Sequence, residues 1–449
     1  MKKVNWQKKM VLGLCLLAAT GLAACGNGDD AGDTKKKDAV SIDSETIKDE
    51  TVLEIYTAKG KLTNYVESAA KLYNEKTGAN IKLEITNVAS GTPMVQMVTP
   101  KLVSQEEMPD IITVTDAAAA GILEKFEDSF YSASDFGFYE KYGSDFYEQK
   151  LDILKAQTSD ETVIPWVVDF TPAISFYQPE KFKAVGINFE DIKSWDEYIE
   201  VAKKVKEKTG AYGIALPEAG DQEFFVDLMG QQDVALLDKD GNINLGTPEA
   251  KNAANLIKKM VDAGIVNFYG AQDGEKAFQE SAMFVAGGWY AANMELNFPD
   301  AAGKWQMTSL VPFAEGKESK VPVSGGSSFY VPKKSKHGDV AQQFLSFMMS
   351  DEDCLAVALE KGVASSNMKA YDTEAAQAGM PYYNDQKYYE LMNEYNKNTA
   401  TISFPPSYSD ATAYVTTAAY EYWKNGDYDA SYLKEADNFA QKYGVKVSK

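Results

Sequence analysis

The chain has 449 residues, 45% of them apolar and 25% charged, which is the composition of a globular protein too long for one hydrophobic core. Its formal net charge of −21 excludes a nucleic-acid partner, because binding to phosphates requires a basic surface. The absence of arginine and the single histidine, His337, disfavour bidentate anion sites, His-rich metal sites and Ser–His–Asp triads, so we expect a neutral or cationic ligand, no metal and no cofactor.

The N-terminal segment is typical of an export signal. Lysines precede an apolar stretch that begins at Met10 and is too short to span a membrane as a stable helix. The segment ends in Leu22-Ala23-Ala24-Cys25, which resembles the lipobox of bacterial lipoproteins. This resemblance implies removal of residues 1–24, lipidation of Cys25 and anchoring at the extracellular face of the cell membrane. A plain secretory signal is the alternative.

The next segment and the remaining cysteine carry no catalytic signal. Residues 26–50 are rich in Gly, Asp, Lys and Ser, which predicts a flexible tether. Cys15 leaves with the signal and Cys25 becomes the anchor, so Cys354 has no disulfide partner. Its apolar neighbours predict a buried helix thiol.

The folded part begins with an alternation of strands and helices. Apolar patterns predict strands at 51–56, 80–85 and 109–114, with a helix ending near Gly78 and another over 93–104. Strands that alternate with helices favour a right-handed, mainly parallel sheet.

A short apolar run later in the chain predicts a ligand contact. Ala282 to Ala286 read as a buried strand, and Gly287-Gly288 then allow a sharp turn into Trp289 and Tyr290. In open α/β sheets, ligands bind beyond the carboxyl ends of the strands. A Trp there offers a flat apolar face and an N–H donor, both suited to a sugar ring. Core filling is the alternative role for Trp289.

Several motifs in a fixed order carry a resemblance. The chain is similar to the family 1 extracellular solute-binding proteins, the maltose-binding-protein-like carbohydrate receptors of ABC importers, over essentially residues 51–449. The matching segments are Asn74-Glu75-Lys76-Thr77-Gly78, Pro109-Asp110-Ile111-Ile112, Val163-Ile164-Pro165-Trp166, Ile174-Ser175-Phe176-Tyr177, Ser194-Trp195-Asp196-Glu197-Tyr198, Ala282 to Trp289, Val323-Ser324-Gly325-Gly326-Ser327, Val331-Pro332-Lys333, 341–347 and Gly362-Val363-Ala364-Ser365-Ser366.

The resemblance implies an α/β fold of the type II periplasmic-binding-protein class, with two doubly wound lobes joined by a multi-crossover hinge. The N-terminal lobe would hold residues 51–170 plus 311–365. The C-terminal lobe would hold residues 171–310 plus 366–449. Prolines near both expected crossovers agree with this division.

A sugar site needs aromatic plates and hydrogen-bonding side chains in a cleft. The candidate plates are Trp289, Trp166, Tyr290 and Phe224, and the candidate hydrogen-bonding groups are Lys59, Asp116, Asp169, Gln222, Glu223 and Ser327. Trp289 and Asp116 match cleft positions of the family. Trp166 and Asp169 lie at the crossover, where ligand contact and hinge packing are both open. We expect Trp195, at a helix start, to be structural.

The predicted function is a monomeric, membrane-anchored binding subunit of an ABC importer. It would close around a carbohydrate, most simply an oligosaccharide, and deliver it to a permease with its ATPase. A receptor for a polyamine or another organic cation is the first alternative, because aromatic walls with carboxylates suit a cation. A secreted glycoside hydrolase is the second, but no carboxylate spacing marks an acid/nucleophile pair, so we expect no enzyme.

Overall fold

The computed structural model describes residues 41–270 and 273–449. The expected signal peptide and Cys25 lie outside these residues. Within the described part of the chain, none of the helices combines the length and the apolar character that a membrane crossing requires.

The strands form one mixed sheet. Along the chain they are β1 (Thr51–Thr57), β2 (Ile81–Asn87), β3 (Ile111–Thr115), β4 (Trp166–Tyr177), β5 (Tyr212–Pro217), β6 (Val266–Tyr269), β7 (Ser281–Gly287), β8 (Gln306–Thr308) and β9 (Val323–Tyr330). Their order is β2-β1-β3-β9-β4-β7-β5-β6, and β8 also pairs with β4. The strands predicted at 51–56, 80–85, 109–114 and 282–286 are therefore present.

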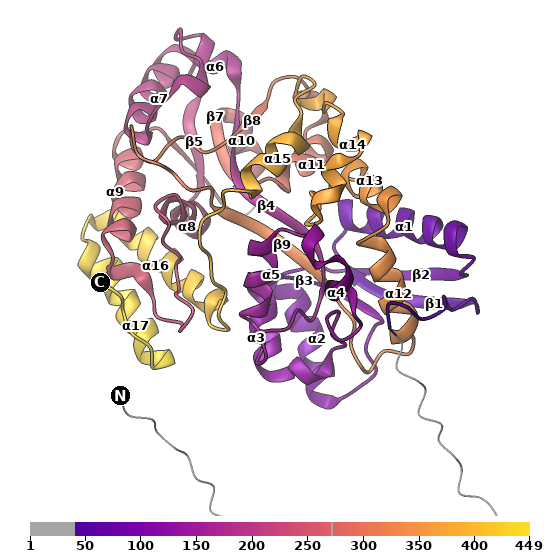
Figure 1. Cartoon of the computed structure of the whole chain (residues 1–449). Coiled ribbons are helices and arrows are strands. Elements are labelled where there is room, and N and C mark those ends of the chain that lie inside the picture. The colour runs from indigo at the N-terminus through magenta and orange to yellow at the C-terminus, as the bar shows by residue number, and fades with distance from the viewer. Residues whose placement is uncertain (1–40, 271–272) are drawn as a thin grey trace, which may run out of the picture. The chain divides into compact units, whose positions relative to one another are not determined.

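The prediction of a mainly parallel sheet holds only toward the two ends. β1 runs parallel to β2 and β3, and β5 runs parallel to β6 and β7. The long central strand β4 is antiparallel to β7, β8 and β9. It is buried along its whole length and connects the first strand group (β1, β2, β3 and β9) with the second (β5 to β8). Figure 1 shows β4 and β9 running side by side through the centre of the described part.

Helices pack on both strand groups. They are α1 (Lys61–Thr77), α2 (Thr92–Ser104), α3 (Asp116–Phe126), α4 (Phe138–Tyr142), α5 (Glu148–Lys155), α6 (Pro179–Lys183), α7 (Trp195–Thr209), α8 (Gln222–Gly230), α9 (Pro248–Asp262), α10 (Gly274–Glu280), α11 (Tyr290–Asn297), α12 (Gly338–Met348), α13 (Glu352–Glu360), α14 (Glu374–Gln377), α15 (Tyr388–Asn396), α16 (Tyr408–Asn425) and α17 (Lys434–Tyr443).

Each strand group has its own hydrophobic core. Side chains of α1 and α12 pack on β1 and β9 in one core, and side chains of α7 to α9 pack with α16 and α17 beneath β5 in the other. Cys354 is fully buried in the first core, as the sequence predicts. The yellow C-terminal helices in Figure 1 therefore belong beside α8 and α9, although they are distant from them in sequence.

Local sequence signals explain individual helix starts. Ser194 accepts a hydrogen bond at its Oγ from the backbone N of Glu197 (3.1 Å) and so caps α7. Trp195, the first residue of α7, is fully buried and donates its Nε1–H to Gln231 Oε1 at 2.8 Å. Its role is structural, as predicted.

The predicted tether needs one correction. Residues 26–40 lie outside the described part, but residues 41–50 contact the folded body instead of forming free chain. The backbone N of Ile42 donates to Phe136 O (2.9 Å), and Ile42 and Ile47 both pack against the core around α1 and α12. These two apolar residues give the segment a surface to bury, which the polar composition around them conceals.

Candidate functional site

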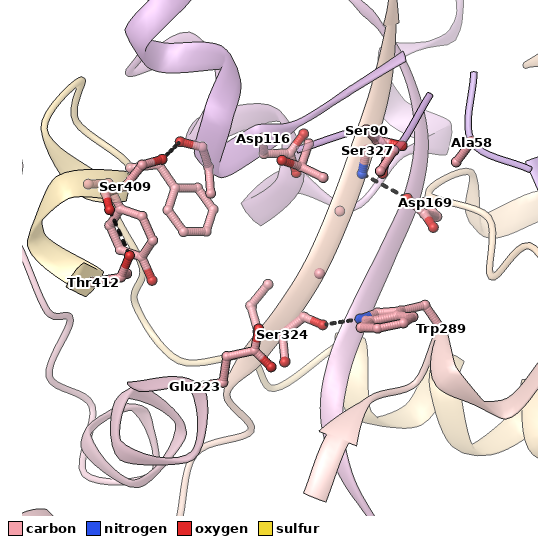
Figure 2. A pocket seen from close by; sticks show the side chains of 18 of the residues that line it. Ala58, Ser90, Asp116, Asp169, Glu223, Trp289, Ser324, Ser327, Ser409 and Thr412 are labelled. Carbon is pink, nitrogen blue, oxygen red and sulfur yellow. Dashed lines mark hydrogen bonds between the residues drawn. The ribbon is translucent and has the colours of Figure 1, made fainter. Parts of the chain in front are cut away.

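A cavity of about 620 Å³ lies where the two strand groups meet. Its wall is built from the carboxyl end of β3, from β4 and β9, from the first turns of α8 and α16, and from Trp289 after β7. This is the position at which open α/β sheets bind ligands. Figure 2 shows Asp116, Asp169, Glu223, Trp289 and Thr412 around this space.

Trp289 is placed by the two glycines that precede it. A Cβ atom on Gly287 would collide with Ser324 O and with the indole ring, and one on Gly288 would lie 2.5 Å from Met392 Sδ. Gly325 has φ +141, and a Cβ there would lie 2.7 Å from the indole Cδ1. The close turn that the Gly-Gly pair predicts is therefore present, and the half-buried ring lines the cavity.

The indole N–H does not face the ligand space as a free donor. Trp289 Nε1 donates to the backbone O of Ser324 at 3.0 Å (Figure 2). The sequence reasoning offered this N–H to a sugar, and the structure corrects that: the bond fixes the ring against β9. What remains for a ligand is the ring face.

Asp116 opens α3 directly after β3 and lies in the cavity wall, but its oxygens are already bonded. It forms an ion pair with Lys150, whose side chain is fully buried, and Ser328 Oγ donates to Asp116 Oδ1 at 3.2 Å. Burial raises the pKa of Asp116, the neighbouring Lys150 opposes that rise, and Asp169 adds to it. The negative charge of Asp116 is thus balanced by Lys150 of the same chain.

Sequence reasoning missed Lys150. A signal was present in the sequence. The apolar surface of α5 consists of Leu151, Ile153 and Leu154, and a lysine on such a surface is expected to be buried beside a carboxylate.

Asp169, on β4, is also paired. Its Oδ2 lies 3.0 Å from Lys61 Nζ, and its Oδ1 accepts from the backbone N of Ser327 at 2.7 Å. These contacts tie β4 to β9 and to α1. Lys59 and Lys61 both line the cavity, so the predicted Lys59 is accompanied by a second lysine that sequence reasoning missed.

The first turns of α8 form the opposite wall. Asp221 caps this helix by accepting from the backbone N of Phe224 at 3.0 Å, and Gln222, Glu223 and Asp227 line the cavity. Burial, together with the charge of Glu223, raises the pKa of Asp221 from 3.8 to about 7. Burial raises the pKa of Glu223, and it raises that of Asp227 far above its usual range, with Glu223 and Asp221 adding to the effect.

Three predicted plates do not belong to this wall. Trp166 is fully buried and donates its Nε1–H to Ser346 Oγ at 2.9 Å, which is the hinge-packing alternative. Phe224 is 2% exposed and packs edge-on against Trp195, with ring centroids 5.3 Å apart. Tyr290 turns away from the cavity wall into the aromatic cluster beneath β4 and β7.

The C-terminal segment supplies wall residues that were not among the candidate plates and hydrogen-bonding groups, although its many tyrosines suggested that one or two would face the cleft. Phe404 and Tyr408 line the cavity with their rings 4.6 Å apart, and Ser409 and Thr412 follow on α16. Ser409 Oγ donates to the backbone O of Ala117 on α3, at 3.5 Å (Figure 2). The tyrosine-rich composition was the only sequence signal, because nothing local shows that α16 returns to the cavity.

Comparison with known proteins agrees with this geometry. The family model "Bacterial extracellular solute-binding protein" matches residues 59–353. The chain belongs to this family. Its members bind solutes outside the cell and are not enzymes, which confirms the predicted family and the predicted absence of catalysis.

Relatives and solved structures extend the match. The chain is similar to the arabinooligosaccharide-binding protein of Bacillus subtilis strain 168, with 25% identity covering 68% of this chain and 70% of the relative. It is 27% identical to the lactose-binding protein of Rhizobium radiobacter, over 67% and 71% of the two chains. The GacH receptor of Streptomyces glaucescens GLA.O, solved free and with acarbose, superposes with a TM-score of 0.71 at 18% identity, covering 88% of this chain and 99% of that one. This likeness confirms the predicted periplasmic-binding-protein fold.

Proposed function

We propose that this solute-binding protein captures a carbohydrate for an ABC importer. The observation that carries the proposal is the ring of Trp289, which is fixed by its bond to Ser324 O and lines a cavity that Phe404 and Tyr408 also line. Aromatic faces match the C–H faces of sugars, and hydroxyl and carboxylate groups around them match sugar hydroxyls. Relatives that bind arabinooligosaccharides and lactose support the same ligand class.

The size of the cavity favours an oligosaccharide. About 620 Å³ lies in the middle of the range for small-molecule sites. We assign residues 51–170 plus 311–365 to the N-terminal lobe and residues 171–310 plus 366–449 to the C-terminal lobe. With these boundaries Asp116 and Trp289 line the cavity from different lobes, so a bound sugar that touches both lobes favours the closed form that the permease and its ATPase recognise.

We also propose that Cys25 carries a lipid anchor and that residues 1–24 are removed. The support is the lipobox-like Leu22-Ala23-Ala24-Cys25 behind a charged and apolar leader. Cells fed an alkyne-tagged fatty acid should label the wild-type chain and not Cys25→Ser, which should appear in the medium. Equal labelling of both chains would contradict the anchor.

Titration with neutral oligosaccharides tests the carbohydrate proposal. The purified full-length chain should give saturable one-to-one heat signals with at least one member of a panel that varies linkage and length. Trp289→Ala should weaken that binding, whereas Tyr420→Ala, an exposed aromatic outside the cavity wall, should not. No saturable binding to any sugar would overturn the proposal. Salt-sensitive binding of spermidine alone would favour the organic-cation alternative.

A further inference from the structure

A smaller cavity of about 230 Å³ adjoins the sugar cavity on the α8 side. Gln222, Glu223 and Asp227 line both spaces, and Asp221 and Tyr269 line the smaller one. The side cavity is thus an acidic extension of the main site.

Asp227 is the unusual member of this group. It is 3% exposed, yet within residues 41–270 and 273–449 its carboxylate takes part in no hydrogen bond and no ion pair. A buried carboxylate normally has a partner, because removing it from water without one is costly. A buried acceptor that has no partner and lines two adjoining cavities therefore indicates that the partner arrives with the ligand.

The charges around Asp227 decide what that partner is. The groups that face it are Asp221 and Glu223 on its own side and Tyr408 from α16, and no lysine lowers its pKa. The lysines that line the main cavity are Lys59 and Lys61, and Lys61 is held by Asp169. The side cavity is acidic, and no lysine is among the described residues that line it.

We propose that the ligand is an amino saccharide whose unacetylated, protonated amino group enters the side cavity and bonds to Asp227 and Glu223. The inference rests on the proposed function, because the sugar ring would occupy the main cavity against Trp289. An ammonium group has three N–H donors and suits several carboxylates around it. No group of three or more acidic, His or Cys side chains in the described residues is arranged to hold a metal ion, so the amine is the better fit.

The raised pKa values of Asp221, Glu223 and Asp227 agree with a site whose carboxylates lack a neighbouring cation. Burial raises the pKa of Asp227 far above its usual range and brings the pKa of Asp221 to about 7. An arriving ammonium group favours the ionised carboxylates, so its binding should release protons. Calorimetry of an amino saccharide in buffers of different ionisation enthalpy should detect this release, and a neutral sugar should give little.

The direct test compares saccharides that differ only in the substituent at C2 of each ring. The first set is the β-1,4-linked glucosamine disaccharide, its diacetylated form and cellobiose, and the second is galactosamine, N-acetylgalactosamine and galactose. In at least one set, the full-length chain should bind the free amine about tenfold or more tightly than both counterparts. Equal or weaker binding of the amine in both sets would overturn the inference.

Matched variants locate the effect. Asp227→Asn keeps the shape and removes the charge, so it should abolish the amine preference. Glu207→Gln removes the same charge from an exposed position on α7 outside both cavities and should keep the preference. A preference that survives in Asp227→Asn would also overturn the inference. Circular dichroism checks folding, and Glu223→Gln, which is exposed in the cavity, carries the same test if Asp227→Asn does not fold.

The outcomes separate the inference from the proposed function. Neutral sugars that bind without any gain from an amine defeat the inference and leave the carbohydrate receptor intact. No binding of any saccharide, neutral or amino, defeats both. Binding of spermidine in place of every saccharide also defeats both, in favour of an organic-cation receptor.

Discussion

The two walls of the cavity carry the same kind of residue in opposite environments. On the side of β3 and β4, Asp116 is paired with Lys150 and Asp169 with Lys61. On the side of α8, Asp227 is as deeply buried as Asp116 but receives no hydrogen bond from the described residues. The carboxylates of the first wall bond to groups of the chain itself, whereas Asp227 in the second wall has no such partner among the described residues.

Lining a cavity is therefore not enough to identify a residue as a ligand contact. Asp116 matched a cleft position of the family and Asp169 was a candidate at the crossover. The oxygens of both are nevertheless largely occupied by Lys150, Ser328, Lys61 and the Ser327 amide. A carboxylate whose partners come from its own chain contributes shape and stability. One without partners is available for recognition.

The largest change in stability is expected when Lys150, the buried partner of Asp116, is removed. Lys150→Met leaves Asp116 buried without its counter-charge and should lower the free energy of unfolding by about 3–5 kcal/mol. Urea denaturation measures this loss. The double variant Lys150→Met with Asp116→Asn should recover most of it, because no charge is then left unpaired. A loss below about 1 kcal/mol would contradict the structural role of the pair.

The aromatic plate comes next. Trp289→Ala removes the ring face and should weaken binding of the best saccharide by about 2 kcal/mol, or roughly thirtyfold. Trp289→Phe keeps a ring but loses the bond to Ser324 O, so its affinity for the saccharide should lie between those of the wild type and Trp289→Ala. Calorimetric titration gives all three values, and an alanine variant that binds like the wild type would remove Trp289 from the site.

Asp221, at the start of α8, should make the free energy of unfolding decrease as the pH rises. The folded pKa of Asp221 is raised from 3.8 to about 7, so the folded chain holds a proton that the unfolded chain releases. Its contribution to stability is complete below about pH 4 and is lost as the pH rises to about 7. Asp221→Asn, which can still cap α8, should therefore be more stable than wild type by at least about 1 kcal/mol near pH 7.5.

Chemical denaturation at several pH values tests this sign. The advantage of Asp221→Asn should vanish near pH 4. An advantage that grows toward low pH would show that the folded pKa is depressed instead.

The smallest effect is expected where a pair is exposed. Lys183 Nζ lies 2.9 Å from Glu180 Oε1, but the side chains are 65% and 80% exposed. Lys183→Ala should change the free energy of unfolding by no more than about 0.5 kcal/mol, since water screens the pair. A loss comparable to that of Lys150→Met would mean that burial does not distinguish the two pairs.

The sequence predicted the parts of the site that local pattern decides. Gly287-Gly288 after a buried strand placed Trp289, and the end of β3 placed Asp116. It could not decide which way Trp166 faces, because β4 shifts register against β9 between Val167 and Asp169. On one side of this irregularity Trp166 lies in the core, and on the other side Asp169 lies in the cavity wall.

The other residues of the site could not be predicted, because tertiary contacts between distant segments place them. Lys150 reaches Asp116 from a separate helix, and Tyr408 reaches the cavity only because α16 folds back beside α3. Neither contact has a local motif. The fold itself followed from ordered motifs over most of the chain, whereas the mixed pairing of β4 depends on contacts between segments more than 100 residues apart.

The decisive measurement is a crystal structure of the chain with the tightest-binding saccharide of the panel. We expect a sugar ring against the face of Trp289, between the wall that holds Asp116 and Asp169 and the wall formed by α8. A saccharide bound elsewhere, with Trp289 covered by protein, would contradict it.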